Sequence, residues 1–280
     1  MMLSKVLLFS LLSLLLVLIP AAKTAGSSFI YAACFPSRYP PNSPFQSSLD
    51  SVLTSIANAA SQSSYASFAA GNDSSSPPGS AAYGLFQCRA DLSSGECSAC
   101  VQSAVGQVGL LCPNAYSASL QLDGCLLRYA DEDFAGKLDT TVVYKKCSPE
   151  RSAGDGGEFF RRRDDVLGDL GSGQEYFRVS SSGAVEGYAQ CVGGLSSGDC
   201  TACLSEAVER LRNACGPALA ADLFLQQCYA RYWTSGYYPG AADAAGYTDD
   251  DIGRTVAIIV GILAGVALLV VFISFMKKAC

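Results

Sequence analysis

The cysteines of this 280-residue chain follow one spacing pattern that occurs twice. Cys88, Cys97 and Cys100 form a C-x8-C-x2-C motif, and gaps of 12 and 13 residues lead to the next two cysteines. The same spacing recurs at an offset of 103 residues, in Cys191, Cys200, Cys203, Cys215 and Cys228. Other residues repeat with it, because residues 92–96 (LSSGE) align with residues 195–199 (LSSGD). A repeat at a fixed offset predicts two copies of one structural unit.

Each copy has one further cysteine upstream, Cys34 for the first and Cys147 for the second. This gives six cysteines per copy and leaves Cys280 over from the total of 13. An even number suits complete disulfide pairing, although the spacing alone does not choose among the many connectivities that six cysteines allow. A small unit gains about 2–4 kcal/mol from each disulfide, so stability alone would explain the cysteines.

The first 25 residues have the order of a secretory signal peptide. Lys5 precedes an apolar stretch over residues 6–19, and small residues follow from Ala21 to Gly26. The alternative, an N-terminal membrane anchor, is disfavoured because the apolar stretch is short and small residues come after it. We therefore expect cleavage between Ala22 and Gly26 and export into an oxidising compartment, where paired cysteines form disulfides.

A second apolar segment, residues 255–276, contains no charged residue. At about 1.5 Å per residue a helix here would be about 33 Å long, enough for a hydrocarbon core of about 30 Å. Lys277 and Lys278 follow the segment, so the positive-inside rule puts the C-terminus in the cytosol and the N-terminus outside. The sequence thus predicts a single-pass protein with an extracellular stalk over residues 239–254 and a cytoplasmic tail over residues 277–280, too short for a folded domain.

The pattern between these segments predicts an α+β fold in two tandem domains, residues 29–136 and 142–238. Apolar residues at helical spacing predict helices over residues 47–60, 98–111, 159–170 and 201–213. Short apolar segments predict strands over residues 83–87, 118–122 and 126–129. We interpret residues 148–157 as a link between the two domains, and the charge run over residues 161–165 as a solvated helix face.

Two CxxC pairs, Cys97–Cys100 and Cys200–Cys203, are also typical of redox dithiols and zinc sites. Structural cysteines are favoured, because each pair belongs to a six-cysteine set in an exported chain without histidine. The lack of histidine also excludes Ser-His-Asp and Cys-His nucleophilic catalysis. A glycosidase needs a pair of carboxylates that has no local sequence signature, so the sequence does not exclude this class of enzyme. A net charge of −6 disfavours nucleic acid. We expect no enzymatic activity, no cofactor and no metal.

Three further features are candidate modification or association sites. Asn72 begins an Asn-Asp-Ser sequon for N-glycosylation, in a loop rich in Ser, Pro and Gly. Cys280 lies beside two lysines near the predicted membrane boundary, where either S-palmitoylation or an idle thiol is expected. Gly261 and Gly265 form a GxxxG motif that suits helix association and a homo-oligomer, although glycine is also common in membrane helices that stay apart.

The repeated motif resembles the plant ginkbilobin-like, or salt-stress/antifungal, cysteine-rich domain. The resemblance rests on C-x8-C-x2-C, the gaps of 12 and 13, and a C-x-x-R-Y ending at Cys125–Tyr129 and Cys228–Tyr232. Two such domains, a stalk, one membrane helix and a short tail resemble the plasmodesmata-located protein family, and the short tail excludes the related cysteine-rich receptor-like kinases. The resemblance implies that each domain packs two helices on an antiparallel sheet of about five strands.

The resemblance also implies a disulfide pairing in each domain. The implied pairs are Cys34–Cys112, Cys88–Cys97 and Cys100–Cys125, then Cys147–Cys215, Cys191–Cys200 and Cys203–Cys228. Secreted antifungal members of the family bind mannose through an Asn, an Arg and a Glu. The corresponding residues here are Phe35, Ser119 and Ala130 in the first domain and Ser148, Asp222 and Trp233 in the second. None matches, so we expect that this mannose site is lost.

The resemblance implies a non-enzymatic receptor-like protein of the plasma membrane at plasmodesmata, a cell junction of plants with links to defence. It would modulate cell-to-cell trafficking with protein partners, through callose deposition. Two alternatives remain. The first is a lectin-like, antifungal carbohydrate-binding protein that contacts cell-wall glycans, and the second is an ectodomain co-receptor for a receptor kinase.

Overall fold

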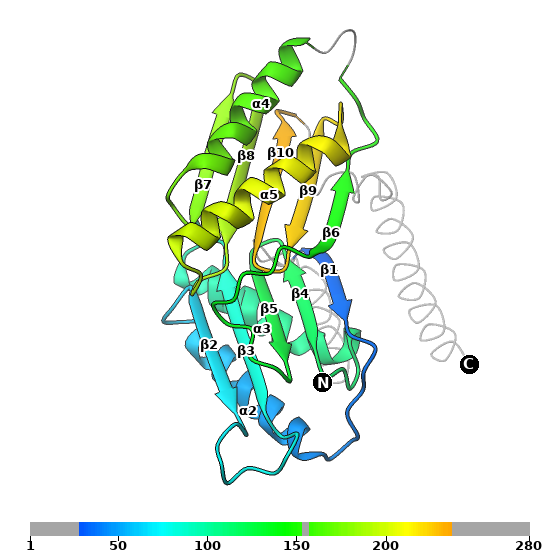
Figure 1. The fold of residues 1–280 in the computed structure, drawn as a ribbon, viewed down its shortest axis with the longest axis vertical. Coiled ribbons are helices and arrows are strands. Elements are labelled where there is room, and N and C mark those ends of the chain that lie inside the picture. The colour runs from blue at the N-terminus through cyan, green and yellow to red at the C-terminus, as the bar shows by residue number, and fades with distance from the viewer. Residues whose placement is uncertain (1–27, 153–156, 237–280) are drawn as a thin grey trace, which may run out of the picture.

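The computed structural model describes residues 28–152 and 157–236. They form two α+β modules of the same construction (Figure 1). Module 1 consists of β1 (Phe29–Cys34), α2 (Pro44–Ala59), β2 (Tyr65–Ala70), β3 (Ala82–Cys88), α3 (Ser94–Leu111), β4 (Ala118–Leu122) and β5 (Cys125–Ala130). Module 2 consists of β6 (Val142–Cys147), α4 (Gly157–Ser172), β7 (Phe177–Ser182), β8 (Val185–Cys191), α5 (Ser197–Cys215), β9 (Ala220–Leu225) and β10 (Cys228–Thr234).

Each module has one five-stranded antiparallel sheet with both helices on one face. The strand orders, β1-β4-β5-β3-β2 and β6-β9-β10-β8-β7, are identical by position. In Figure 1, α4 and α5 lie in front of the upper sheet, whereas α2 and α3 lie behind the lower one. The prediction of two tandem modules, each with two helices on a five-stranded antiparallel sheet, is confirmed.

The repeated LSSG segment begins a helix in each module. Ser93 caps α3 by accepting a hydrogen bond from the Glu96 amide, and the Glu96 carboxylate accepts one from the Ser93 amide. In module 2, Ser196 caps α5 by accepting from the Asp199 amide. Caps of this kind contribute about 1 kcal/mol each and set where the helix begins. They explain why α3 and α5 begin earlier than the apolar pattern alone predicts.

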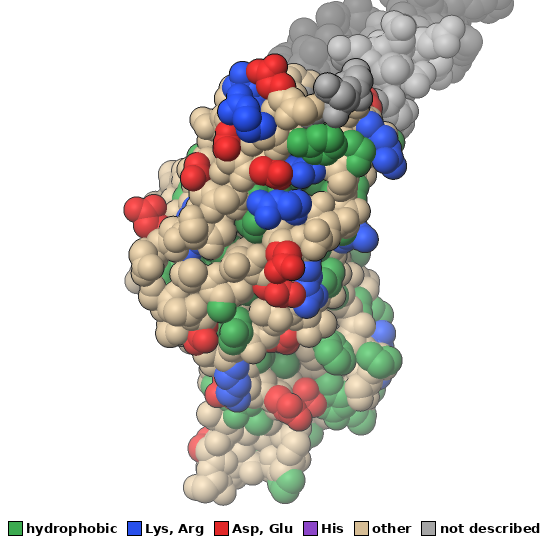
Figure 2. Space-filling model, turned by 45° about the horizontal axis from the view of Figure 1, so that its top comes forward, with side chains coloured by type: hydrophobic (Ala, Val, Ile, Leu, Met, Phe, Trp, Pro, Cys, Tyr) green, Lys and Arg blue, Asp and Glu red, His purple; other side chains and the backbone are tan. Residues whose placement is uncertain are grey.

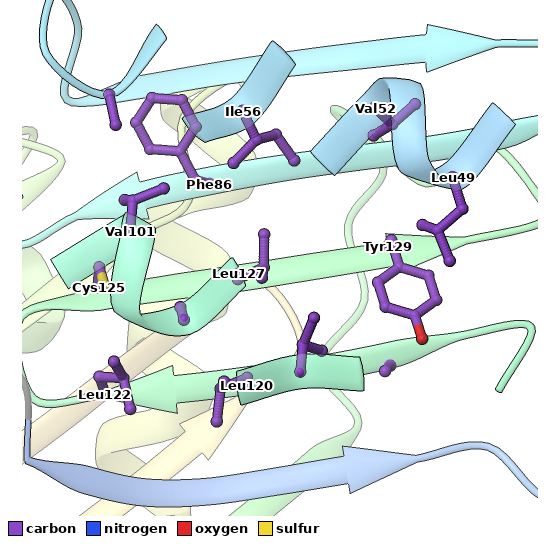
Figure 3. Packing of buried hydrophobic residues seen from close by; sticks show 14 of the residues in the cluster. Leu49, Val52, Ile56, Phe86, Val101, Leu120, Leu122, Cys125, Leu127 and Tyr129 are labelled. Atoms are coloured by element: carbon purple, nitrogen blue, oxygen red, sulfur yellow. The ribbon is translucent and has the colours of Figure 1, made fainter. Parts of the chain in front are cut away.

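The core of module 1 lies between its helices and its sheet (Figure 3). Leu49, Val52 and Ile56 project from α2 at helical spacing and are buried against the sheet. The sheet contributes alternate residues, among them Leu120 and Leu122 of β4, because side chains alternate between the two faces of a strand. Module 2 repeats this arrangement with its own core.

Three disulfides join the second helix of each module to the sheet. In module 1 they are Cys34–Cys112, Cys88–Cys97 and Cys100–Cys125, and in module 2 Cys147–Cys215, Cys191–Cys200 and Cys203–Cys228. These are the pairs that the family resemblance implies. The cysteines of each CxxC pair are therefore bonded to other partners and not to each other.

Two sequence interpretations are wrong. Residues 148–157 do not link the modules, because β6 pairs with β9 and thus already belongs to module 2. The segment between the modules is residues 131–141, which we call the linker. The charge run is not wholly solvated either, since Arg163 is buried, donates to the Gly216 carbonyl and pairs with Asp164 at 2.8 Å.

No helix within residues 28–152 and 157–236 is long and apolar enough to cross a membrane. The predicted signal peptide, stalk, membrane helix and tail, with Gly261, Gly265 and Cys280, lie outside the described residues. On the face shown in Figure 2, acidic and basic side chains are interspersed and give no single-sign patch. Such a face creates little of the directional field that steers strongly charged partners.

Candidate functional site: the interface between the modules

The sheet face away from the helices, which we call the open face, brings the two modules together. Strands β4, β5 and β9 are buried along their whole length, so their open-face residues are covered as well as their core residues. A separate apolar cluster forms there, in which Leu85 and Leu126 of module 1 pack with Val192 of module 2. Phe134 of the linker packs against the same cluster.

The contact is pseudo-symmetric, because equivalent residues of the two modules meet reciprocally. The Arg231 guanidinium donates from Nη1 to Oδ1 of Asp123 at 2.8 Å, and Arg128 donates from Nη1 to the Gln226 carbonyl at 3.3 Å. Both donors and both acceptors are separated by the repeat offset of 103 residues. In a two-fold interface residue i contacts j and j contacts i, and the two modules approximate this arrangement within one chain.

Two tyrosines mark the centre of the pseudo-symmetric contact. Tyr31 and Tyr144 each lie three residues before the first cysteine of their module. Their rings stack with centroids 5.5 Å apart and planes inclined by 17°, while Phe224 meets Tyr31 edge-on. Such ring pairs contribute about 0.5–1.5 kcal/mol beyond the area they bury, so they help to hold the modules in one orientation.

A charged network lies beside the aromatic residues. Arg231 is buried and pairs with Asp222 of its own module at 2.6 Å as well as with Asp123. Asp123 in turn accepts from Arg89 at 2.7 Å, and Arg231 also donates to the Tyr188 hydroxyl. Each arginine thus faces at least one carboxylate, which offsets the cost of taking these charges out of water.

The network shifts the pKa values of its members. Burial alone would raise the pKa of Asp123, but the nearby Arg231 and Arg89 outweigh it and hold that pKa below its usual value. Burial would lower the pKa of Arg231, but Asp222 and the other neighbours raise it well above the ordinary range. Burial raises the pKa of Tyr188, so its hydroxyl stays protonated. Asp123 and Arg231 therefore stay charged at neutral pH, which suits a structural ion pair.

Glutamine side chains complete the contact with backbone hydrogen bonds. Gln190 donates to the Cys88 carbonyl at 2.9 Å, and the equivalent Gln87 accepts from the Gly193 amide at 2.9 Å. Gln227 donates to the Phe134 carbonyl at 3.2 Å and ties the linker to module 2. The buried polar groups are therefore paired, which favours one fixed orientation of the modules.

The interface leaves little space for a ligand. A cavity of about 20 Å³, lined by Gln87, Gln121, Gln190 and Asp123 among others, lies between the modules. This volume suits about one water molecule. Among the described residues there is also no group of three or more Cys, Asp or Glu side chains arranged to hold a metal ion. The interface thus joins the modules to each other and is not shaped for a cofactor.

The positions that correspond to the family's mannose site serve other contacts. Asp222 is committed to Arg231, and the Ser148 hydroxyl donates to the Glu150 carbonyl at 2.7 Å. Trp233 packs edge-on against Tyr188. In module 1, Ser119 and Ala130 are buried, while Phe35 is exposed. The Asp222 and Ser148 side chains at these positions are thus engaged within the protein.

Comparisons with known proteins agree with this architecture. A family model described as Salt stress response/antifungal matches residues 33–132 and 146–235. Plasmodesmata-located protein 8 of Arabidopsis thaliana is 54% identical over 252 residues, which cover 90% of this chain and 89% of the relative. The chain belongs to the plasmodesmata-located protein family. Plasmodesmata-located protein 6 of Arabidopsis thaliana, another member, is 44% identical over 92% of this chain and 91% of its own length.

Two crystal structures of the family resemble both modules together. The tandem DUF26 ectodomain of the Arabidopsis thaliana cysteine-rich receptor-like protein PDLP8 has a TM-score of 0.71 and 56% identity. It covers 75% of this chain and is itself covered completely. The ectodomain of PDLP5 gives a TM-score of 0.69 at 39% identity, over 74% of this chain and all of its own. This chain therefore shares the tandem arrangement with two members of the plasmodesmata-located protein family.

The residues of the interface were not predicted as a site from the sequence. One signal was present, because an arginine repeats in the C-x-x-R-Y ending as Arg128 and Arg231. A charged residue at the same place in two otherwise apolar strands indicates a buried partner. Asp123, the partner of Arg231, lies in the turn before β5, and Gln226, the partner of Arg128, lies in the turn before β10. Each arginine thus has its partner in the opposite module, which sequence spacing does not reveal.

Proposed function

We propose that the chain is a non-enzymatic, single-pass receptor-like protein of the plasma membrane at plasmodesmata. Its N-terminal modules lie outside the cell and its short C-terminal tail lies in the cytosol. It modulates cell-to-cell trafficking through protein partners, receptor kinases among them, and callose deposition is the resulting change at the channel. The helix over residues 255–276 carries targeting and, through Gly261 and Gly265, lateral association.

The extent of the similarity to the plasmodesmata-located relatives carries this proposal. The match to the first relative runs over 252 residues, which exceeds the 210 residues from 29 to 238. It therefore includes sequence outside the two modules. Together with the 89% coverage of the plasmodesmata-located relative, this extent favours the architecture of that family over a protein that shares the modules alone.

The interface supports a recognition role in a second way. Reciprocal hydrogen bonds and ion pairs hold the modules as one unit, so their outer surfaces keep a constant spacing. A partner that contacts both modules then pays little to order the ectodomain, because preorganisation lowers the cost of binding.

Localisation of the full chain in living plant cells tests the proposal. A fluorescent protein joined after Cys280 is expected in puncta at the walls between cells, coincident with callose staining. The matched control keeps both modules but replaces residues 255–276 with an unrelated membrane helix of equal length. Even fluorescence along the plasma membrane for the natural chain would refute the proposal, and loss of puncta in the control alone would support targeting by the helix.

A second measurement addresses trafficking. Spread of a freely diffusing fluorescent protein from single transformed cells is compared between cells with the natural chain and cells with the helix-swapped control. We expect a changed spread and changed callose only with the natural chain. Equal spread in both would contradict the role in trafficking, even if the puncta are present.

A further inference from the structure

Module 1 has a cavity of about 280 Å³ on its open face, apart from the covered network of Arg231. Its floor is formed by β2 and β3, and one wall is the linker. The lining residues include Ser67, Ala69, Tyr83, Asp133 and Phe134. The size is near the lower end of ligand pockets, which span about 300–1,000 Å³, and therefore suits a single small ring.

The sequon asparagine lines the same cavity. Asn72 lies two residues after the end of β2 and is one of the residues that border this space. The turn is anchored on both sides of Asn72, because Gly71 accepts a hydrogen bond from the Ser80 hydroxyl at 2.9 Å and Asp73 accepts from the Ser75 amide at 2.9 Å. Asn72 itself is exposed, as a modified residue must be.

We propose that Asn72 is N-glycosylated and that the first sugar ring of the glycan occupies this cavity. In the modification, the Asn72 amide nitrogen bonds to C1 of the sugar while the bond from C1 to the lipid diphosphate donor breaks. The amide proton is lost as the lipid diphosphate leaves. The first ring of such a glycan is an N-acetylhexosamine attached directly to the amide, so it must lie beside the residues that Asn72 contacts.

The chemistry of the cavity matches that ring. The cavity is lined by the aromatic side chains of Tyr83 and Phe134 and by Ala69, apolar groups that suit the C–H side of a pyranose. The Ser67 hydroxyl and the Asp133 carboxylate offer polar atoms to its hydroxyl edge. Asp133 accepts the Ala135 amide at 3.1 Å, and its side chain is about half exposed, so acceptor capacity remains.

The sugar would brace the linker. The Phe134 ring lies under Arg128, with the guanidinium carbon 4.2 Å from the ring centroid, and its carbonyl accepts from Gln227 of module 2. A sugar ring that packs against Phe134 from the cavity side restricts that side chain further. Glycosylation of module 1 is therefore coupled to the contact between the modules, beyond the solubility that any surface glycan provides.

The test uses the full chain, purified in detergent from a plant host, in three forms. One form carries the complete glycan, one is trimmed enzymatically to the first sugar, and one is the Asn72→Gln variant, which keeps an amide. We expect mass spectrometry to show an occupied Asn72, and thermal unfolding to give equal midpoints for the first two forms. The Asn72→Gln midpoint is expected about 2–4 °C lower, the shift that about 1 kcal/mol produces in a chain of this size.

Two further variants separate packing in the cavity from a general effect of the glycan. Ala69→Tyr fills the cavity from an exposed position, and Tyr83→Ser removes one wall. In each background, the difference between the glycosylated and the Asn72→Gln forms should fall below half of its original value. An unmodified Asn72, a trimmed form that unfolds like Asn72→Gln, or an undiminished difference in Ala69→Tyr would each overturn the proposal.

Discussion

Arg231 of module 2 and Asp123 of module 1 lie 108 residues apart in the chain and form an ion pair with 2.8 Å between Nη1 and Oδ1. Asp123 also pairs with Arg89, and Arg231 with Asp222, so the pair connects the charged groups of both modules. We expect the interface between the modules to depend on this link more than on any ion pair at the surface.

Asp123→Ala should destabilise the chain by about 1–3 kcal/mol, because it leaves two arginines without this partner in a partly buried site. The lower part of that range applies if water replaces the carboxylate, since the Asp123 side chain is 33% exposed. Asp91→Ala is the matched control, because Asp91 binds the same Arg89 from an exposed position. It should cost less than about 1 kcal/mol. Denaturant unfolding measures both, and equal losses would contradict a special role for Asp123.

The Asp123 pKa predicts a dependence of stability on pH. A carboxyl whose pKa is lower in the folded state stabilises the fold above its unfolded pKa of about 3.9, and this contribution is lost as pH falls through the folded pKa. Stability from this group should therefore be constant from neutral pH to about pH 5 and decline below about pH 4. Unfolding free energies between pH 7 and pH 3 test this, and Asp123→Asn should weaken the decline. An identical profile in the variant would refute the assignment.

The disulfides should contribute unequally to stability. Cys34–Cys112 closes a loop with a sequence separation of 78 residues, whereas Cys88–Cys97 closes one of 9. Loop-closure entropy then predicts a loss of about 4.5 kcal/mol when the first pair is replaced by serines and about 2.6 kcal/mol for the second. Denaturant midpoints of the two double variants measure the order. Cys191–Cys200, which has the same separation as Cys88–Cys97, is the control and should resemble it.

The pseudo-symmetry predicts that module 1 associates with itself when module 2 is absent. In a homodimer that reuses this interface, Arg128 takes the place of Arg231 and meets Asp123 of the other copy, because Arg128 and Arg231 are equivalent. We expect residues 28–136, secreted alone, to form a concentration-dependent dimer in analytical ultracentrifugation. Leu126→Asp, which places a charge in the apolar cluster, should abolish it. A monomer at all concentrations would argue against reuse of this surface.

Local patterns predicted much of the fold because their causes lie close together along the chain. The cysteine spacing repeats visibly, and the helices show their apolar face within a few turns, as Leu49, Val52 and Ile56 do in α2. Strands were harder to predict, and β9 was missed because it is buried on both faces and loses the alternation that marks a half-exposed strand. The segment over residues 148–157 was misassigned for a related reason, because its composition resembles a linker although β6 already pairs within module 2.

The sequence by itself determined that the chain carries two copies of one cysteine-rich unit, since spacing and count are properties of the chain and do not depend on its folding. Only the tertiary structure decided how the copies meet. The covered face of each sheet is set by contacts such as those of Tyr31 with Tyr144 and of Arg231 with Asp123. The two residues of each contact are more than 100 positions apart in the chain. No local preference encodes such pairs, because each residue is compatible with an exposed position until the opposite module removes the water around it.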